Sequence, residues 1–148
     1  MSQELVKDWM SKEVITIDVD TCCLPKAHRL MTDNNIRRLP VVDKNGRLVG
    51  IVTRGDIRGA QPSQATSLSI WELNYLLANL KIADIMTSNP VTVSENSTIG
   101  EAADIMLANK VSGLPVLNDA GQLAGIITES DIFRMVVRHE WGAKEPAT

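Results

Sequence analysis

Two threonine–aspartate pairs carry the side chains best suited to ligand chemistry in this chain. Thr53 is followed three residues later by Asp56, and Thr128 is followed at the same spacing by Asp131. An apolar run precedes each threonine, so each pair lies where a buried strand is expected to lead into a helix. Backbone N–H groups and the positive end of the helix dipole favour an anion there. The hydroxyl can donate to a phosphate oxygen, and the carboxylate can accept from both hydroxyls of a ribose.

The same spacing also has a purely structural interpretation. Thr-x-x-Asp is close to a capping box, in which the hydroxyl and the carboxylate satisfy the first N–H groups of the helix itself. Spacing alone favours this capping role over ligand binding.

Both pairs belong to an internal repeat. Residues 36–58 (IRRLPVVDKNGRLVGIVTRGDIR) match residues 111–133 (VSGLPVLNDAGQLAGIITESDIF) without a gap. Upstream, residues 9–17 match residues 85–93, with one extra residue in the first copy between the two matching segments. Two copies of a unit of about 50 residues therefore make up most of the chain.

Each copy predicts the same order of elements, β-α-β-β-α, from β-branched runs, helical apolar spacing and a glycine turn. The first copy predicts strands at Val14–Asp18, Pro40–Val42 and Leu48–Val52, and helices at Leu24–Asn35 and from near Thr53. The second predicts strands at Val91–Ser94, Pro115–Leu117 and Leu123–Ile127, and helices at Ile99–Lys110 and from near Thr128. A copy of this size is only marginally stable alone, so the two are expected to pack through their apolar faces.

The predicted organisation is a first repeat at 1–60, a linker at 61–81, a second repeat at 82–142 and a tail at 143–148. The linker contains an amphipathic helix near 69–77. We expect its aromatic residues, Trp71 and Tyr75, to pack on the chain's own core rather than on a partner subunit.

Composition excludes several classes of protein. The chain has 148 residues, of which 44% are apolar and 22% charged, as in an ordinary globular protein. A net charge of −3 and only 3% aromatic residues disfavour a nucleic-acid binder. No apolar run is long enough to cross a membrane, and the first residues do not resemble a secretory signal, so a cytoplasmic location is expected.

Metal and thiol chemistry are equally disfavoured. Cys22 and Cys23 are adjacent, which suits neither a disulfide nor a metal site. His28 and His139 are far apart and have no neighbours at metal-ligand spacing. No base and nucleophile share an evident motif, so an enzyme is not expected.

The order of motifs resembles a known family. A Met-Ser or Met-Thr dipeptide (Met10-Ser11 and Met86-Thr87) is followed by a strand, a helix, Leu-Pro-Val and Gly-Ile-(Val/Ile)-Thr-x-x-Asp. This order is similar to the cystathionine-β-synthase (CBS) domain. Its occurrence over roughly 6–58 and again over 82–134 resembles a CBS pair, or Bateman module. The stand-alone form resembles small bacterial acetoin-utilisation-like proteins.

The resemblance implies an α+β fold in which two β-α-β-β-α repeats pack about a pseudo-twofold axis. It implies a regulatory module that binds AMP, ADP, ATP, S-adenosylmethionine or a dinucleotide such as NAD, with no catalytic role. It further implies a homodimer and an output through an effector protein that the sequence does not identify.

The resemblance also reverses the preference for capping, because the matching positions of its nucleotide-binding members contact ribose and phosphate. The arginines before the first Leu-Pro then lie where the family places phosphate contacts. The segments 14–16 and 90–92, together with the two Leu-Pro dipeptides, resemble those that form the family's adenine slot. For the slot positions, ordinary strand packing explains the residues equally well. The predicted ligand-binding residues are Val14, Thr16, Arg37, Arg38, Leu39, Pro40, Thr53, Arg54, Asp56, Pro90, Thr92, Ser112, Gly113, Pro115, Thr128 and Asp131.

The two copies differ at the positions that would meet phosphate. Arg37, Arg38 and Arg54 of the first copy are replaced by smaller or acidic residues in the second, namely Ser112, Gly113 and Glu129. Because guanidinium groups suit phosphate, the first copy is expected to bind a phosphate-bearing ligand more tightly. Arg37 or Arg38 could nevertheless serve either site. The alternative hypothesis is a dimerisation or interaction scaffold without a ligand.

Overall fold

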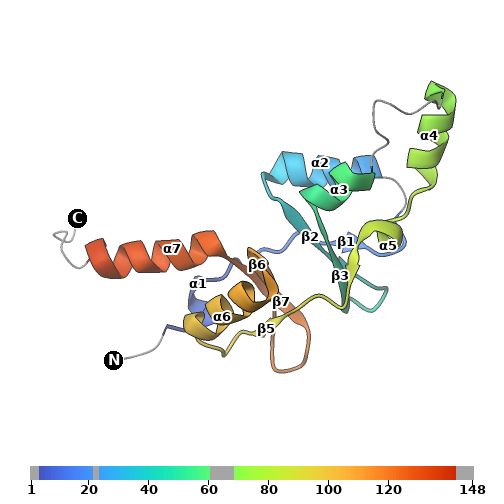
Figure 1. Ribbon diagram of the computed structural model, residues 1–148. Helices are drawn as coiled ribbons and strands as arrows, with labels where there is room; N and C mark the ends of the chain where they lie inside the picture. The colour runs from blue at the N-terminus through green and yellow to red at the C-terminus, as the bar shows by residue number, and fades with distance from the viewer. Residues whose placement is uncertain (1–3, 22–23, 61–68, 143–148) are drawn as a thin grey trace. The chain divides into compact units, whose positions relative to one another are not determined.

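The computed structural model describes residues 4–21, 24–60 and 69–142 (Figure 1). Cys22, Cys23, most of the predicted linker before its helix, and the predicted tail lie outside the described residues. The chain forms two compact units. Ile15–Pro90 forms one, here called the first-repeat unit. The other, the second-repeat unit, joins the segment up to Val14 to the chain from Val91 onward.

The first-repeat unit contains a mixed four-stranded sheet in the order β1-β2-β3-β4. Its elements are β1 (Ile17–Asp18), α2 (Leu24–Asn34), β2 (Arg38–Val42), β3 (Leu48–Thr53), α3 (Arg54–Ala60), α4 (Ile70–Asn79), α5 (Ile82–Ile85) and β4 (Thr87–Ser88). Strand β1 is parallel to β2, whereas β2–β3 and β3–β4 are antiparallel. Helices α2 and α3 pack together and bury Ala27, Met31 and Ile57 against the strand residues Leu39 and Val52.

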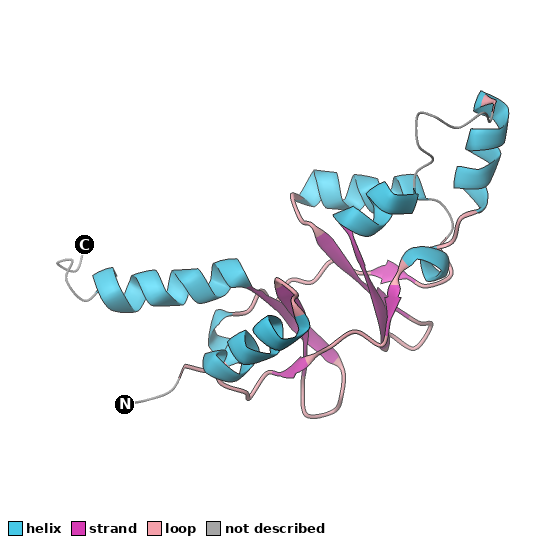
Figure 2. Cartoon of the chain, in the orientation of Figure 1, coloured by secondary structure: helices cyan, strands magenta, loops and turns pink. Residues whose placement is uncertain are grey.

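The second-repeat unit repeats this arrangement with a three-stranded sheet, β5-β6-β7. Its elements are α1 (Val6–Trp9), β5 (Val93–Ser94), α6 (Ile99–Asn109), β6 (Gly113–Leu117), β7 (Leu123–Thr128), α7 (Glu129–Val137) and the π-helical turn η1 (Arg138–Gly142). The register is the same: Val116 faces Gly125 as Val41 faces Gly50. Figure 2 shows helices and a small sheet in each unit.

The predicted α+β fold and its β-α-β-β-α repeats are confirmed. The first strand of each repeat is shorter than expected, because only Ile17–Asp18 and Val93–Ser94 pair with a neighbouring strand. Helix α6 ends at Asn109, because the left-handed backbone of Lys110 (φ 55°) stops the helix, and Asn35 (φ 53°) follows α2 in the same way.

The segment that precedes each repeat packs on the sheet of the other repeat. The repeat pattern in the sequence does not reveal this exchange. Ser11 exchanges two backbone hydrogen bonds with Ile126 of β7, at 2.9 and 3.0 Å. Correspondingly, β4, which follows Met86, pairs with β3 of the first repeat. Each unit is therefore completed by the segment that precedes the other repeat, whereas the predicted boundaries follow the repeats along the sequence.

A cluster of polar and aromatic side chains ties the N-terminal segment to the end of α7. The Trp9 indole N–H donates to Glu4 Oε2 at 2.7 Å, and His139 Nε2 lies 2.6 Å from Glu4 Oε1. The guanidinium carbon of Arg138 lies 5.8 Å from the centre of the Trp9 ring, at cation–π distance. Glu4 is thus held by two partners that are far apart in sequence.

Helix α4 differs from the expectation that its aromatic residues pack on the chain's own core. Ser69 caps this helix, with its side chain accepting from the N–H of Glu72 at 3.2 Å. Trp71 is 80% exposed and Tyr75 is 69% exposed. The helix therefore forms where the pattern predicts it, but these two side chains face solvent.

We predict that Gly125→Ala destabilises the protein by about 1–3 kcal/mol, the usual cost of overpacking. A Cβ at this position would lie 2.6 Å from the Ser11 carbonyl oxygen and 2.7 Å from Met10 Sδ. Gly59→Ala is the matched control, since a Cβ there meets no atom within 4 Å. Urea denaturation of both variants measures the difference; equal stabilities would contradict the close packing of the N-terminal segment on β7.

We predict that Glu4 adds to stability at neutral pH and loses this contribution in acid. The hydrogen bond from Trp9, and then that from His139, lowers the pKa of Glu4 below its ordinary value of 4.5, although burial partly opposes the shift. A lowered folded-state pKa gives stability that is present above pH 4.5 and disappears as pH falls through the folded value.

The melting temperature of the Glu4→Gln variant should therefore depend less on pH below 4.5 than that of the unsubstituted protein. The exposed Glu13→Gln serves as the control. Parallel pH profiles for the parent and Glu4→Gln would show that the Trp9–Glu4–His139 contacts do not form in solution.

Candidate functional site

The sheet topology brings predicted site residues to one end of each sheet. In the first-repeat unit, Arg38 at the start of β2 faces Thr53 at the end of the antiparallel β3. Because β1 runs parallel to β2, Thr16, which precedes β1, lies toward the same end. In the second-repeat unit, Gly113 faces Thr128 in the same way, and Thr92 precedes β5.

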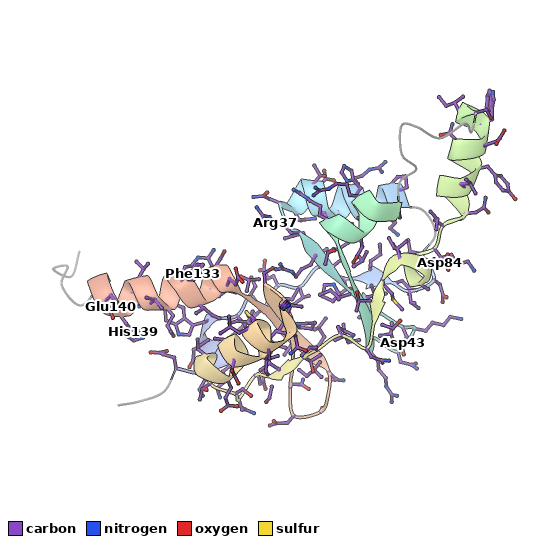
Figure 3. The ribbon with its side chains drawn as sticks, viewed as in Figure 1. Arg37, Asp43, Asp84, Phe133, His139 and Glu140 are labelled. Atoms are coloured by element: carbon purple, nitrogen blue, oxygen red, sulfur yellow. The ribbon has the colours of Figure 1, made fainter. Side chains whose placement is uncertain are left out.

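Backbone hydrogen bonds tie the start of the second strand to the start of the following helix. The Arg54 N–H donates to the carbonyl oxygen of Arg37 at 2.9 Å, and the Glu129 N–H donates to that of Ser112 at 3.0 Å. The residue that precedes each middle strand is thereby fixed beside the helix N-terminus. Figure 3 shows Arg37 at this end of β2, where the chain leaves α2.

The first Thr–Asp pair forms a reciprocal cap on α3. Asp56 Oδ2 accepts from the Thr53 N–H at 2.8 Å, and Thr53 Oγ1 accepts from the Asp56 N–H at 3.1 Å. Among the residues that the structure describes, none donates a hydrogen bond to Asp56 Oδ1. The half-buried carboxylate therefore uses one oxygen for the cap, and no hydrogen bond within the described part of the chain occupies the other.

The second pair forms the same cap on α7 but engages more atoms. Asp131 Oδ2 accepts from both the Thr128 N–H (2.9 Å) and the Thr128 hydroxyl (3.2 Å). Asp131 Oδ1 accepts from Arg134 Nη1 at 2.6 Å. The Asp131 side chain is 11% exposed, and both of its oxygens have protein partners.

The capping interpretation of Thr-x-x-Asp thus describes both turns in this structure. At each turn, two of the backbone N–H groups that could bind an anion have partners within the chain. The Arg54 N–H donates to the Arg37 carbonyl oxygen, and the Asp56 N–H donates to Thr53 Oγ1. The corresponding N–H groups of α7 donate in the same way. The side chains of Arg37 and Arg54 add positive charge near the first turn.

The other predicted site residues fall into two groups. Leu39, Pro40 and Pro115 are fully buried, so their side chains belong to the cores and only their backbone could face a ligand. Val14, Thr16, Pro90 and Thr92 are half-buried and precede the first strands. Arg134 was not predicted; comparison of the two copies at this position, where the first has Gly59, is the signal that could have found it.

Among the described residues, no group of three or more His, Cys, Asp or Glu side chains is placed to hold a metal ion. The described helices are also each too short or too polar to span a bilayer.

A family model for the CBS domain matches residues 6–63 and again residues 82–138. The chain belongs to the CBS domain family. Its two copies form a CBS pair, as the sequence motifs predicted.

Solved CBS pairs have the same fold. The CBS domain pair of protein MJ0100, solved with 5′-methylthioadenosine and S-adenosyl-L-methionine, is 33% identical, with a TM-score of 0.74 over 97% of this chain and 100% of that one. CBSX2 of Arabidopsis thaliana, solved with AMP, is 26% identical, with a TM-score of 0.76 over 93% of this chain and 98% of that one. An acetoin utilization protein (AcuB) of Vibrio cholerae is 26% identical, with a TM-score of 0.77 over 99% of this chain and 100% of that one.

Curated relatives differ widely in length. The chain spans 92% of a CBS domain-containing protein of Dictyostelium discoideum, to which it is 40% identical. By contrast, it spans only 22–24% of relatives that are named as enzymes. The similarity to those enzymes therefore covers a minor part of each.

We predict that the Asp131 carboxylate stabilises the start of α7. Asp131→Ala removes the acceptor for the Thr128 N–H and should cost about 0.5–2 kcal/mol of unfolding free energy, the range for a lost helix cap. Asp131→Asn keeps one carbonyl oxygen for that bond and should cost less. Chemical denaturation measures both; equal losses in the two variants would mean that the cap does not determine the stability.

Proposed function

We propose that this CBS pair is a regulatory module that binds an adenosine compound: AMP, ADP, ATP, S-adenosylmethionine or NAD. It would sense that ligand and signal to a partner protein or through its own homodimer. Two observations support the proposal: two similar CBS pairs were solved with adenosine-containing ligands, and this chain carries a Thr–Asp turn in each repeat.

The arrangement around Asp56 carries the proposal. Its Oδ2 atom is held by the Thr53 N–H, so the orientation of the carboxylate is fixed, while Oδ1 has no donor from the described chain. A carboxylate in this state can accept from the two hydroxyls of a ribose. The Thr53 hydroxyl accepts from the Asp56 N–H and retains its own proton, which it can donate to a phosphate oxygen.

Positive charge at this end of β2 and β3 suits the phosphate of such a ligand. Arg37 is exposed, Arg54 is half-buried, and the two are joined through their backbones. The second-repeat unit has Ser112 and Glu129 at the same positions. We therefore propose that the first repeat binds the phosphate-bearing ligand more tightly than the second.

The proposal includes no catalytic residue and no metal or catalytic cofactor; the adenosine compound is a regulatory ligand. Nucleic acid is not proposed as a partner, given the net charge of −3. A ligand that binds one conformation better than another shifts the equilibrium between them, and a partner can respond to that shift.

The second candidate is a ligand-free dimerisation or interaction scaffold. It is favoured by the reciprocal caps at both turns and by the burial of Leu39, Pro40 and Pro115. The exposed aromatic residues of α4 would also suit an interaction surface.

A thermal-shift and calorimetric panel with AMP, ADP, ATP, S-adenosylmethionine and NAD separates the two candidates. A ligand at ~100 times its dissociation constant should stabilise the protein by about 2.7 kcal/mol. We expect at least one adenosine compound to do so, with GMP as the base-specificity control. No response to any compound in the panel would favour the scaffold.

We predict that Asp56→Asn lowers the affinity for the best ligand of the panel at least tenfold, whereas Asp131→Asn changes it less than twofold. The asparagine keeps an oxygen for the Thr53 N–H but replaces the available oxygen with an amide that cannot accept from ribose. Isothermal titration gives both affinities, and melting curves control for folding. Equal losses in the two variants would contradict the proposed preference for the first repeat.

A further inference from the structure

Arg134 distinguishes the two Thr–Asp turns at the one carboxylate oxygen that the caps do not use. Its Nη1 atom lies 2.6 Å from Asp131 Oδ1, at the distance of a charge-assisted hydrogen bond. Arg134 follows Asp131 by three residues, so the two side chains share a face of α7. In the first repeat the residue three positions after Asp56 is Gly59, which has no side chain.

The two acids consequently differ in what they can offer to a ligand. Asp131 receives three hydrogen bonds, two on Oδ2 from Thr128 and one on Oδ1 from Arg134. Asp56 receives one on Oδ2, and no described residue donates to its Oδ1. A ribose that approaches Asp131 therefore competes with Arg134 for Oδ1, whereas at Asp56 it competes with no side chain of the described residues.

The strength of this competition follows from exposure. The Asp131 side chain is 11% exposed, but that of Arg134 is 68% exposed. The exposed Arg134 can turn into solvent, and the ribose hydroxyls would then replace its hydrogen bond to the buried Asp131 carboxylate. An ion pair whose arginine is exposed is individually weak. Arg134 should therefore reduce ligand affinity by a small factor rather than close the turn completely.

We propose that Arg134 is a specificity-determining residue of the second repeat, which competes with a ribose diol for Asp131 Oδ1. The inference rests on the proposed function. It adds a second difference between the repeats, which concerns binding of the ribose. The first difference, in the arginines, concerns binding of the phosphate. A neutral nucleoside thus distinguishes it from the phosphate preference, because adenosine carries no charge for any arginine to attract.

The opposite role for Arg134 gives a different result in the same experiment. If its guanidinium instead left Asp131 to bind the ligand phosphate, its removal would weaken the binding of AMP and leave that of adenosine unchanged. Competition for the ribose predicts tighter binding of adenosine when Arg134 is removed. Adenosine and AMP are therefore both used as probes.

The experiment isolates the second repeat in the full chain. In an Asp56→Asn background, Arg134→Gln should bind adenosine about two- to fivefold more tightly than the background alone, the range expected from loss of one ion pair whose arginine is exposed. Arg138→Gln is the matched control, because this arginine lies one turn further on and its guanidinium lies over Trp9. Isothermal titration gives the affinities, and melting curves establish that each variant is folded.

The reciprocal substitution tests the first repeat without disturbing the second. Gly59→Arg places an arginine three residues after Asp56, where a Cβ meets no atom within 4 Å. Adenosine binding by the first repeat should weaken about two- to fivefold. Gly59→Gln, which has no positive charge, should change it little. This arm remains decisive if Arg134→Gln does not fold.

The outcomes separate this inference from the proposed function. If the unsubstituted protein binds neither adenosine nor AMP, nor any other compound of the panel, the proposed function fails and the inference fails with it. If the unsubstituted protein binds, but neither Arg134→Gln nor Gly59→Arg changes adenosine affinity, the inference alone is overturned. Weaker AMP binding by Arg134→Gln, with adenosine unchanged, would overturn it in favour of a phosphate contact.

Discussion

The reciprocal hydrogen bonds between a threonine and the aspartate three residues later are the constraint on which both candidate sites depend. At the β3–α3 turn they satisfy the backbone N–H groups of Thr53 and Asp56 and fix the carboxylate in one orientation. Capping and ligand binding do not exclude each other, because a carboxylate has two oxygens and the cap uses only one. The cap occupies the Asp56 N–H of α3 and holds the second oxygen of this carboxylate in a defined direction.

The fold could be predicted from the sequence to the extent that its determinants are local. Apolar periodicity and β-branched runs place α2, α6 and the paired middle strands within a few residues. The exchange of leading segments could not be predicted in the same way. Met10 and Met86 stand before similar repeats, and both sheets present a glycine, Gly125 or Gly50, on which a methionine packs. Which methionine meets which glycine depends on how the chain is connected in three dimensions, and the local pattern carries no information about this.

The candidate site shows the same division between local and tertiary information. The spacing of Thr53 and Asp56 predicts their contact, and the strand register brings Arg38 opposite Thr53. The same spacing could not predict the hydrogen bond from the Arg54 N–H to the Arg37 carbonyl oxygen, because Arg37 lies before β2, outside the Thr-x-x-Asp turn. The ion pair of Arg134 was missed for another reason. Matching residues identify a repeat, whereas Arg134 is informative because its counterpart, Gly59, does not match.

Differences at four positions between the copies would favour nucleotide binding by the first repeat: Arg37, Arg38, Arg54 and Gly59. The arginines would act on the phosphate, whereas the lack of a side chain at Gly59 would affect the ribose, so the two kinds of effect on affinity should combine. If only the first repeat binds a ligand, that ligand stabilises one of the two units and not the other. Helix α3 also packs against α5, which contributes the buried Ile82 to the same core and leads the chain toward the second repeat. A ligand that stabilises the start of α3 would therefore also stabilise its packing against α5 within the first-repeat unit.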